Sequence, residues 1–430
     1  MKSLLHFIVL CAFVSGSLPA AMAQDAVAPP GTAPLKDAAP MTVTAAVERA
    51  IRQSNELRRR EAQLAQARAQ HAQAELLPNP VATYTREDLT ADDRSYAEWS
   101  ATLEYPLLAL LARGPRVDAA ERSMEATALR VSRHRATLRY QTQLDFLTLW
   151  AARRTLDAWR TLGDGVRRLS ETAALRAAEG EISPYEEQRL RTELSRLQWR
   201  ITEATEARRA AESALAFTLG LSSDSLARVP LVLPRPGSDS LHVAELVRIG
   251  LQRREDVQAL QAEREATERR GTWLRRRWME DITLGGGYKQ QSDLFRGPVI
   301  ALSLPLPLFD RDQGNTAATE AETTALTHEL EGRKRQIEGD IRAAVSSYNA
   351  LARQSRQMAT LTPEEYDGML AAATAAYTEG EFTLLQYVDA ITAYMESAEL
   401  DVRVRVALLR AAFTVAHVTG DATVPFYELP

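Results

Sequence analysis

Residues 301–315, ALSLPLPLFDRDQGN, contain the end of a predicted strand and the start of a predicted helix. Ile300, Leu302, Leu304 and Leu306 recur at every second position, which is the pattern of a strand with one apolar face. Two prolines and the segment Asp-Arg-Asp-Gln-Gly then end the strand. The residues that follow are rich in Ala, Glu, Arg and Leu, which favour helix. The stretch therefore joins a short apolar strand directly to a long helix.

Three further segments alternate between apolar and polar residues. They are VATYTRED (81–88), SYAEWSATLEY (95–105) and EDITLGGGYKQ (280–290). Each approaches the ~9–11 residues of a strand that crosses a bilayer at a tilt. We expect the apolar face, with Trp99 and Leu302, to contact lipid, and the polar face, with Glu98 and Glu104, to line a wet lumen. The alternative is a sheet on the surface of a soluble protein, which alternates in the same way.

Four strands in lipid cannot stand alone, because every backbone donor and acceptor there must be paired within protein. The chain must therefore associate with copies of itself. Two copies would give an eight-stranded barrel whose side chains largely fill the interior. Three copies would give twelve strands and an open lumen, so we expect a homotrimer with a 12-stranded antiparallel transmembrane β-barrel if the protein conducts anything sizeable.

The sequence also contains matching landmarks 199 or 200 residues apart, which predict a tandem duplication. The matched pairs are Gly180 with Gly380, Gly220 with Gly420, Gly163 with Pro363, and Pro106 with Pro305. Each predicted repeat has a helix, two strands, a long helix to a tip and a return helix. The first repeat covers 41–220, with strands at about 80–105 and a tip at about 180. The second covers 241–420, with strands at about 281–306 and a tip at about 380.

The long helical segments indicate a mainly α-helical fold with a small β part. No proline occurs between Arg116 and Ile182, and only three glycines interrupt this stretch. Roughly 64 helical residues would make a rod about 96 Å long, which suits a tube and not a compact domain. Several shorter helices in a bundle are the alternative, but the turn signals that they need are missing before Gly163. Residues 221–240, rich in Pro, Gly and Ser, predict a linker between the repeats.

The N-terminus predicts export. Lys2 precedes the apolar run LLHFIVLCAFV, and Ala21 and Ala23 form an A-x-A cleavage pattern, so residues 1–23 are predicted to be a signal peptide. Residues 24–40 are expected to be a flexible leader, and 421–430 a C-terminal tail. The single cysteine, Cys11, lies within the signal, which leaves no disulfide or thiolate site in the mature chain. No later segment has 18 consecutive apolar residues, so we expect any membrane crossing to use strands.

Composition and motifs argue against an enzyme and against nucleic-acid binding. The chain has 430 residues, and its net charge of −5 is spread along the helices with both signs interleaved, so it has no concentrated basic surface. The six histidines are scattered singly, without the spacing of a zinc site. We therefore expect no catalytic residues, no cofactor and no bound metal.

Four segments carry a resemblance to a known family. They are AAEGEISPYE (177–186), AYTEGEFTLLQYVDA (376–390), RREDVQALQAEREAT (253–267) and SLPLPLFDRDQGN (303–315). Together with the duplication, they resemble the TolC-like outer-membrane efflux proteins, and the last two are most similar to the CzcC-type heavy-metal efflux subgroup. The resemblance covers nearly all of the mature chain. It implies a trimeric barrel in the outer membrane continued by a twelve-helix tunnel through the periplasm.

The resemblance also implies where partners would bind. The tips of the two hairpins would dock a periplasmic adaptor protein; the residues concerned are Gly180, Glu181, Ile182, Ser183, Gly380, Glu381, Phe382 and Thr383. Gln386 and Asp389 match two positions that narrow the tunnel entrance, although Gln386 stands where the family has an acidic residue. A turn without a partner, and an Asp389 that merely pairs with a neighbouring helix, are the alternatives.

The expected function is that of a passive outer-membrane exit duct in a tripartite efflux system. It would carry heavy-metal cations from an inner-membrane pump of the RND type. An exit duct for drugs or for type I secretion is an alternative within the family. A periplasmic adaptor protein is the alternative of another class, but it would have one helical hairpin and more β-structure.

Overall fold

The computed structural model describes residues 40–91, 94–237, 239–357, 363–420 and 427–428. The predicted signal peptide, nearly all of the predicted leader and most of the predicted C-terminal tail lie outside these residues. The helices are α1 (Val43–Gln53), α2 (Asn55–Glu75), α3 (Ala109–Ala178), α4 (Pro184–Leu219), α5 (Ser223–Ala227), α6 (Val243–Arg253), α7 (Glu255–Arg276), the 3₁₀ helix η1 (Arg277–Asp281), α8 (Gln313–Gln357), α9 (Pro363–Thr378) and α10 (Leu384–Thr419). The strands are β1 (Met41–Thr42), β2 (Val81–Ala91), β3 (Arg94–Tyr105), β4 (Leu231–Val232), β5 (Arg235–Pro236), β6 (Thr283–Gln291), β7 (Arg296–Ser303) and β8 (Tyr427–Glu428).

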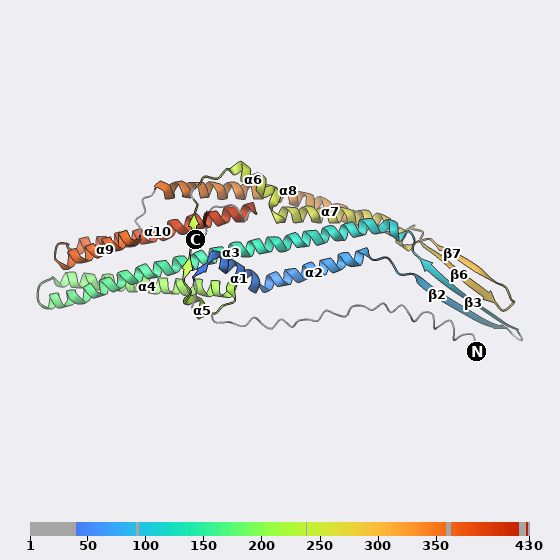
Figure 1. Cartoon of the computed structure of the whole chain (residues 1–430), viewed down its shortest axis with the longest axis horizontal. Helices are drawn as coiled ribbons and strands as arrows, with labels where there is room; N and C mark the ends of the chain where they lie inside the picture. Colours follow the sequence, from blue (N-terminus) through green and yellow to red (C-terminus); the bar gives the residue numbers. More distant parts are fainter. Residues whose placement is uncertain (1–39, 92–93, 238, 358–362, 421–426, 429–430) are drawn as a thin grey trace. The chain divides into compact units, whose positions relative to one another are not determined.

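The four longer strands form one antiparallel sheet in the order β2-β3-β6-β7 (Figure 1). Its register places Trp99 opposite Arg86 and Gln290, and Thr102 opposite Thr83 and Gly287. The apolar positions expected from each segment therefore share one face, and the polar positions share the other. Among the described strands, β2 and β7 are each paired on one side only, so the sheet of a single chain is open.

The last strand is shorter than expected. It ends at Ser303, so Leu304 and Leu306 lie beyond it, 54% and 76% exposed. The reason is Pro305, which has no N–H to donate to a neighbouring strand. The start of the third strand also differs from our expectation. Glu280 and Asp281, which we expected in this strand, belong to the 3₁₀ helix η1.

α3 is a single helix of 70 residues, and it begins at Ala109, with Pro115 inside it. At ~1.5 Å per residue it is about 105 Å long. The expected rod is confirmed, and the helix continues through Gly163. A Cβ at Gly163 would lie 2.6 Å from Cδ1 of Ile201, so the glycine allows α4 to approach closely. In the second half, by contrast, α8 ends at Gln357 and α9 begins at Pro363.

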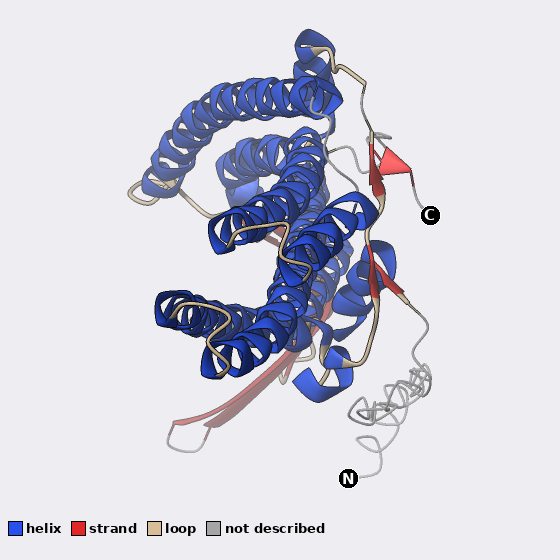
Figure 2. Ribbon diagram, turned by 90° about the vertical axis from the view of Figure 1, so that its left-hand side faces the viewer, coloured by secondary structure: helices blue, strands red, loops and turns tan. Residues whose placement is uncertain are grey.

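The helices lie side by side in one curved layer (Figure 2). α3 packs against α1, α2, α4, α7 and α10, and α8 packs against α6, α7 and α10. The breaks between α1 and α2 and between α6 and α7 fall at Ser54 and Arg254, again 200 residues apart, where the backbone is extended. None of the described helices combines the length and the apolarity that a membrane-spanning helix requires.

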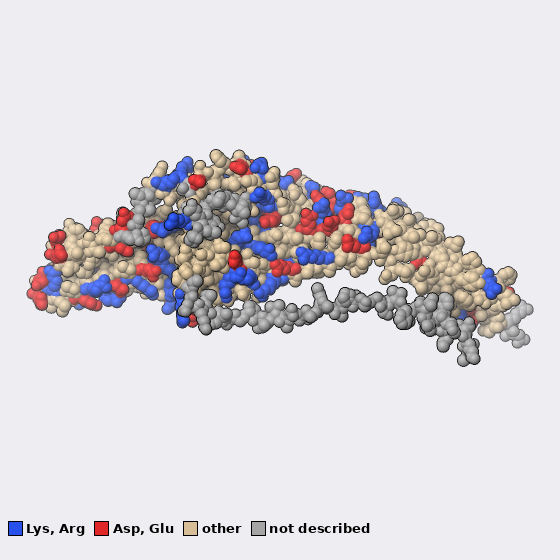
Figure 3. Space-filling view, viewed as in Figure 1, with Lys and Arg blue, Asp and Glu red and all other residues tan. Residues whose placement is uncertain are grey.

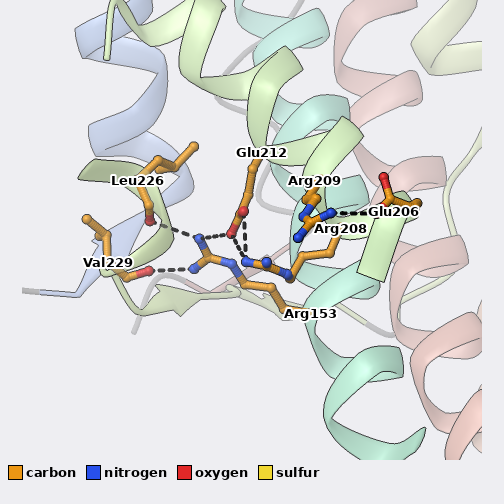
Figure 4. Close-up of polar contacts among 7 residues, drawn as sticks. All are labelled: Arg153, Glu206, Arg208, Arg209, Glu212, Leu226 and Val229. Atoms are coloured by element: carbon orange, nitrogen blue, oxygen red, sulfur yellow. Dashed lines mark hydrogen bonds and ion pairs between the residues drawn. The ribbon is translucent and has the colours of Figure 1, made fainter. Parts of the chain in front are cut away.

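The described residues of the predicted linker, 221–237 and 239–240, form a packed connection. It contains α5, and β4 pairs in parallel with β1. Leu226 and Val229 are buried in a core shared with α1, α3, α4 and α10. The Arg153 guanidinium of α3 donates to their carbonyl oxygens at 2.9 and 2.6 Å and to Oε1 of the buried Glu212 at 3.0 Å (Figure 4). The segment is therefore fixed to the helical layer by both apolar and polar contacts.

Candidate functional site

The two predicted tips have the same backbone structure. Gly180 and Gly380 have φ of 80° and 82°, the left-handed region that glycine occupies without strain. At the first tip, the N–H of Gly180 donates to Ala177 and that of Glu181 to Arg176; at the second, Gly380 donates to Tyr377 and Glu381 to Ala376. These paired bonds are a Schellman motif, which satisfies the last carbonyls of α3 and α9.

Each return helix then starts with a capping box. Ser183 accepts from the backbone N–H of Glu186, whose carboxylate accepts from the backbone N–H of Ser183. Thr383 and Gln386 make the same exchange at the start of α10, with the Thr383 N–H 2.8 Å from Oε1 of Gln386. The amide of Gln386, predicted to narrow the entrance, therefore binds Thr383 within its own turn. Asp389, the other predicted entrance residue, is exposed.

The two apolar side chains among the predicted docking residues differ from each other in their contacts. Ile182 is half-buried against the cluster of Ala173, Leu190 and Leu384, and Phe382 is 37% exposed. The physical reason for the burial of Ile182 is that the first residues of α10 lie against the tip of the α3–α4 hairpin and supply Leu384.

Two more exposed residues were missed by the sequence reasoning. Tyr185 is 70% exposed and Leu385 is 73% exposed. Each is the second residue of a return helix, and they lie 200 residues apart, so the repeat spacing could have found them. These two residues and Phe382 are here called the tip surface. Its acidic neighbour Glu181 forms an ion pair with Arg176 at 3.1 Å.

The core behind the second tip is aromatic. The rings of Tyr377 and Tyr387 stack with centroids 5.1 Å apart, and Tyr366 meets Tyr394 edge to face at 5.5 Å. The hydroxyl of Tyr394 donates to Asp367 at 3.1 Å. Burial is the main cause that raises the pKa of the Tyr394 phenol above its ordinary value, so it stays a neutral donor. The exposed apolar residues of the tip surface thus lie beside a well-packed core.

The apolar face of the sheet is the second candidate surface. Ile300, Leu302 and Leu103 on this face are 83%, 62% and 57% exposed. The ring of Trp99 lies between those of Tyr84 and Tyr288, with centroids 6.2 and 6.1 Å apart. In Figure 3, charged side chains cover the helices, whereas the sheet shows few of them on the face turned to the viewer. An exposed apolar band with aromatic rings is typical of a surface that contacts lipid.

The polar face of the sheet contains the two predicted lumen residues. Glu98 forms an ion pair with Lys289, with 2.8 Å between Oε1 and Nζ, and it accepts hydrogen bonds from Tyr96 and Gln291. Glu104, six residues further along β3, accepts a hydrogen bond of 3.4 Å from the Thr283 hydroxyl. The same register therefore places both glutamates on one face, with different partners.

Where α3, α7 and α10 meet, a polar group lies half-buried among the helices. The His417 ring stacks on Tyr140 with centroids 4.4 Å apart, and its Nε2 lies 3.1 Å from Nη2 of Arg133. Since a guanidinium can only donate, Nε2 accepts this hydrogen bond. Burial, followed by the charges of Arg133 and Arg254, lowers the pKa of His417 to about 4. The imidazole is therefore neutral at physiological pH.

Comparisons with known proteins agree with this fold. Residues 246–421 match the family described as outer membrane efflux protein. The cobalt-zinc-cadmium resistance protein CzcC of Cupriavidus metallidurans is 26% identical over 385 residues, which cover 88% of this chain and 90% of CzcC.

Solved structures are similar over most of the chain. A membrane protein from Pseudomonas aeruginosa aligns with a TM-score of 0.69 at 20% identity, covering 88% of this chain and 93% of that one. VceC of Vibrio cholerae aligns with a TM-score of 0.67 at 18% identity, covering 88% and 96%. CusC is a protein whose crystal structures concern folding and transmembrane channel formation. It aligns with a TM-score of 0.66 at 16% identity, covering 88% of this chain and 91% of CusC. The chain is thus similar to CzcC over most of its length and has the fold of these solved structures, which agrees with the resemblance to the TolC-like outer-membrane efflux proteins that its sequence predicted.

Proposed function

We propose that three copies of this chain form a passive efflux channel of the outer membrane, with the helices as a tunnel in the periplasm. The proposal needs no catalytic residues, because the channel supplies a path and the pump supplies the energy. The substrates would be heavy-metal cations, as the name of the cobalt-zinc-cadmium resistance protein CzcC suggests. An inner-membrane pump of the RND type and a periplasmic adaptor would complete the system.

The observation that carries this proposal is the sheet. Its apolar side chains are exposed on one face and its polar side chains lie on the other. Its outer strands β2 and β7 each have a free side that no other described strand pairs with. In lipid such edges must be paired, and pairing β7 of one copy with β2 of the next would close a barrel. The polar face, with Glu98 and Glu104, would then line the lumen.

The tip surface would receive the adaptor. Tyr185, Leu385 and Phe382 are exposed in the single chain although a packed core lies beside them. Large apolar side chains in this position are typical of a protein–protein contact. Asp389 is exposed and lies six residues after Thr383. Each chain of the trimer would place this one carboxylate near the tunnel entrance.

Deletion of the gene, followed by separate growth tests on metals and on drugs, tests the function. We expect sensitivity to cobalt, zinc or cadmium salts, with recovery when the gene is supplied on a plasmid. Sensitivity to drugs alone would assign the channel to drug export. Membrane fractionation of the wild-type protein tests its location in the outer membrane, and cross-linking tests the trimer. A soluble monomer would contradict the proposal.

A further inference from the structure

A groove of about 270 Å³ lies where α1, α3, the start of α7 and the end of α10 meet. Val43 and Val47 of α1 form part of its apolar wall. Its polar lining includes side chains from three other helices; they are Arg139, Gln143, Glu255 and His417. A concave site with an apolar wall and a few convergent polar groups is typical of small-molecule binding.

Three polar groups of this lining lack hydrogen-bond partners among the described residues. Gln143 is only 8% exposed, yet its side-chain amide forms no hydrogen bond with any of them. Nδ1 of His417 and Oε2 of Glu255 are buried and also lack a partner. Most buried polar groups in folded proteins are paired, because an unpaired one loses its hydrogen bonds to water without compensation. Three such groups around one groove therefore point to a molecule that binds there and pairs with them.

The hydrogen bonding of His417 argues against a metal ion as this molecule. Nε2 accepts a hydrogen bond from Nη2 of Arg133 at 3.1 Å, so the proton of the neutral ring is on Nδ1. A protonated Nδ1 is a donor and has no lone pair to offer a cation. In addition, the described residues contain no group of three His, Cys, Asp or Glu that could hold a metal ion. His417 therefore offers an N–H donor.

The two charged side chains of the lining have opposite signs. Arg139 and Glu255 are both half-buried, and no ion pair joins either of them to another described residue. An anion in the groove would leave the carboxylate of Glu255 without a counter-charge, and a cation would leave the guanidinium of Arg139 without one. Water would pair with Gln143 and His417 but would compensate neither charge. A molecule that carries both charges compensates both.

We propose that the groove binds a small amino acid in its zwitterionic form. The carboxylate of the amino acid would accept hydrogen bonds from Arg139, Gln143 and Nδ1 of His417. Its ammonium group would donate to Glu255, and a short apolar side chain would lie against the two valines of α1. All of these lining residues belong to one chain, so the site does not depend on the trimer or on the proposed transport function.

Isothermal titration calorimetry of the purified full-length protein with L-alanine tests the site. We expect saturable binding to the wild type. Acetate and methylammonium, which each carry one of the two charges, and acetamide, which carries neither, should bind about tenfold or more weakly.

Variants of the lining test which residues are responsible. Arg139→Gln and Glu255→Gln should each weaken the binding of L-alanine by about tenfold or more, because each removes a charge-assisted hydrogen bond. The matched control is Arg135→Gln. Arg135 lies one turn earlier on α3 and forms an ion pair of 3.0 Å with Glu61 outside the groove, so its replacement should leave the affinity unchanged. Thermal unfolding without L-alanine shows that each variant is folded before the affinities are compared.

Three results would overturn the inference. The first is a wild type that does not bind L-alanine saturably. The second is acetate or acetamide binding as tightly as L-alanine, because one of the two charges would then have no role. The third is a loss of affinity in Arg135→Gln equal to that in Arg139→Gln, because the loss would then not come from the groove. The comparison of ligands on the wild type decides the question even where a variant does not fold, and none of these results bears on the metal sensitivity that tests the proposed function.

Discussion

The guanidinium of Arg153 in α3 donates a hydrogen bond of 3.0 Å to the carboxylate of Glu212 in α4. Only 5% of the Glu212 side chain is exposed, and it accepts two further bonds from Arg208 of its own helix. Arg153 in turn holds the carbonyl oxygens of Leu226 and Val229. One buried carboxylate thus fixes the arginine that ties the segment between the two halves to the helices.

Replacing Glu212 with Gln should destabilise the fold. The change leaves Arg153 and Arg208 without their counter-charge, and we expect a loss of about 2 kcal/mol in the free energy of unfolding, a moderate value because both arginines are partly exposed. The control is Glu206→Gln, which removes an ion pair with Arg209 on the same helix whose side chains are 63% and 64% exposed. That loss should be below about 1 kcal/mol. Denaturant unfolding of both variants measures the difference, and equal losses would contradict the structural role of Glu212.

The two faces of the sheet should respond differently to an added charge. Leu302→Arg places a guanidinium on the apolar face, where lipid contact makes it cost roughly 2–4 kcal/mol, so fewer trimers should reach the outer membrane. Thr102→Arg places the same group on the polar face, opposite Gly287, and should assemble normally. Heat-modifiable migration of membrane fractions on gels reports assembly. Equal defects would mean that both faces are buried in protein.

The lowered pKa of His417 predicts how the free energy of unfolding depends on pH. Its pKa is about 4 in the folded protein, below the ordinary histidine value, so between about pH 6.5 and 4 the unfolded chain binds a proton that the folded chain does not. The contribution of His417 to stability is therefore complete above pH 6.5 and decreases as the pH falls through this range. Thermal unfolding of the wild type and of His417→Gln at pH 7.5 and pH 5 tests this. The wild type should lose more stability between these pH values than the variant.

The sequence predicted the strands well because alternation has a simple physical cause. Trp99, Leu302 and Tyr84 all had to be on one face, and the register of the sheet places them there. The long helix was predicted from the scarcity of proline and glycine, and it continues through Gly163 because a glycine in a helix costs only about 1 kcal/mol, which contact with α4 offsets. The contacts of Arg153 and the burial of Ile182 could not be predicted, because they join residues that are far apart in the sequence. Local sequence patterns therefore predict the helices and strands. Tertiary contacts decide which apolar side chains at the tips are buried and which stay exposed.

The tip surface should be needed for partnership and not for folding. Tyr185→Asp combined with Leu385→Asp changes two side chains that are 70% and 73% exposed, so the variant should still insert as a trimer. It should lose cross-linking to the adaptor and lose efflux, because a carboxylate buried in an apolar contact without a partner is costly. Ile182→Asp is the contrasting variant. Its side chain packs on Ala173, Leu190 and Leu384, so this change should reduce the stability of the hairpin itself. Normal efflux by the double variant would place the adaptor elsewhere on the tunnel, and failure of the double variant to form trimers would show that the tip surface is structural.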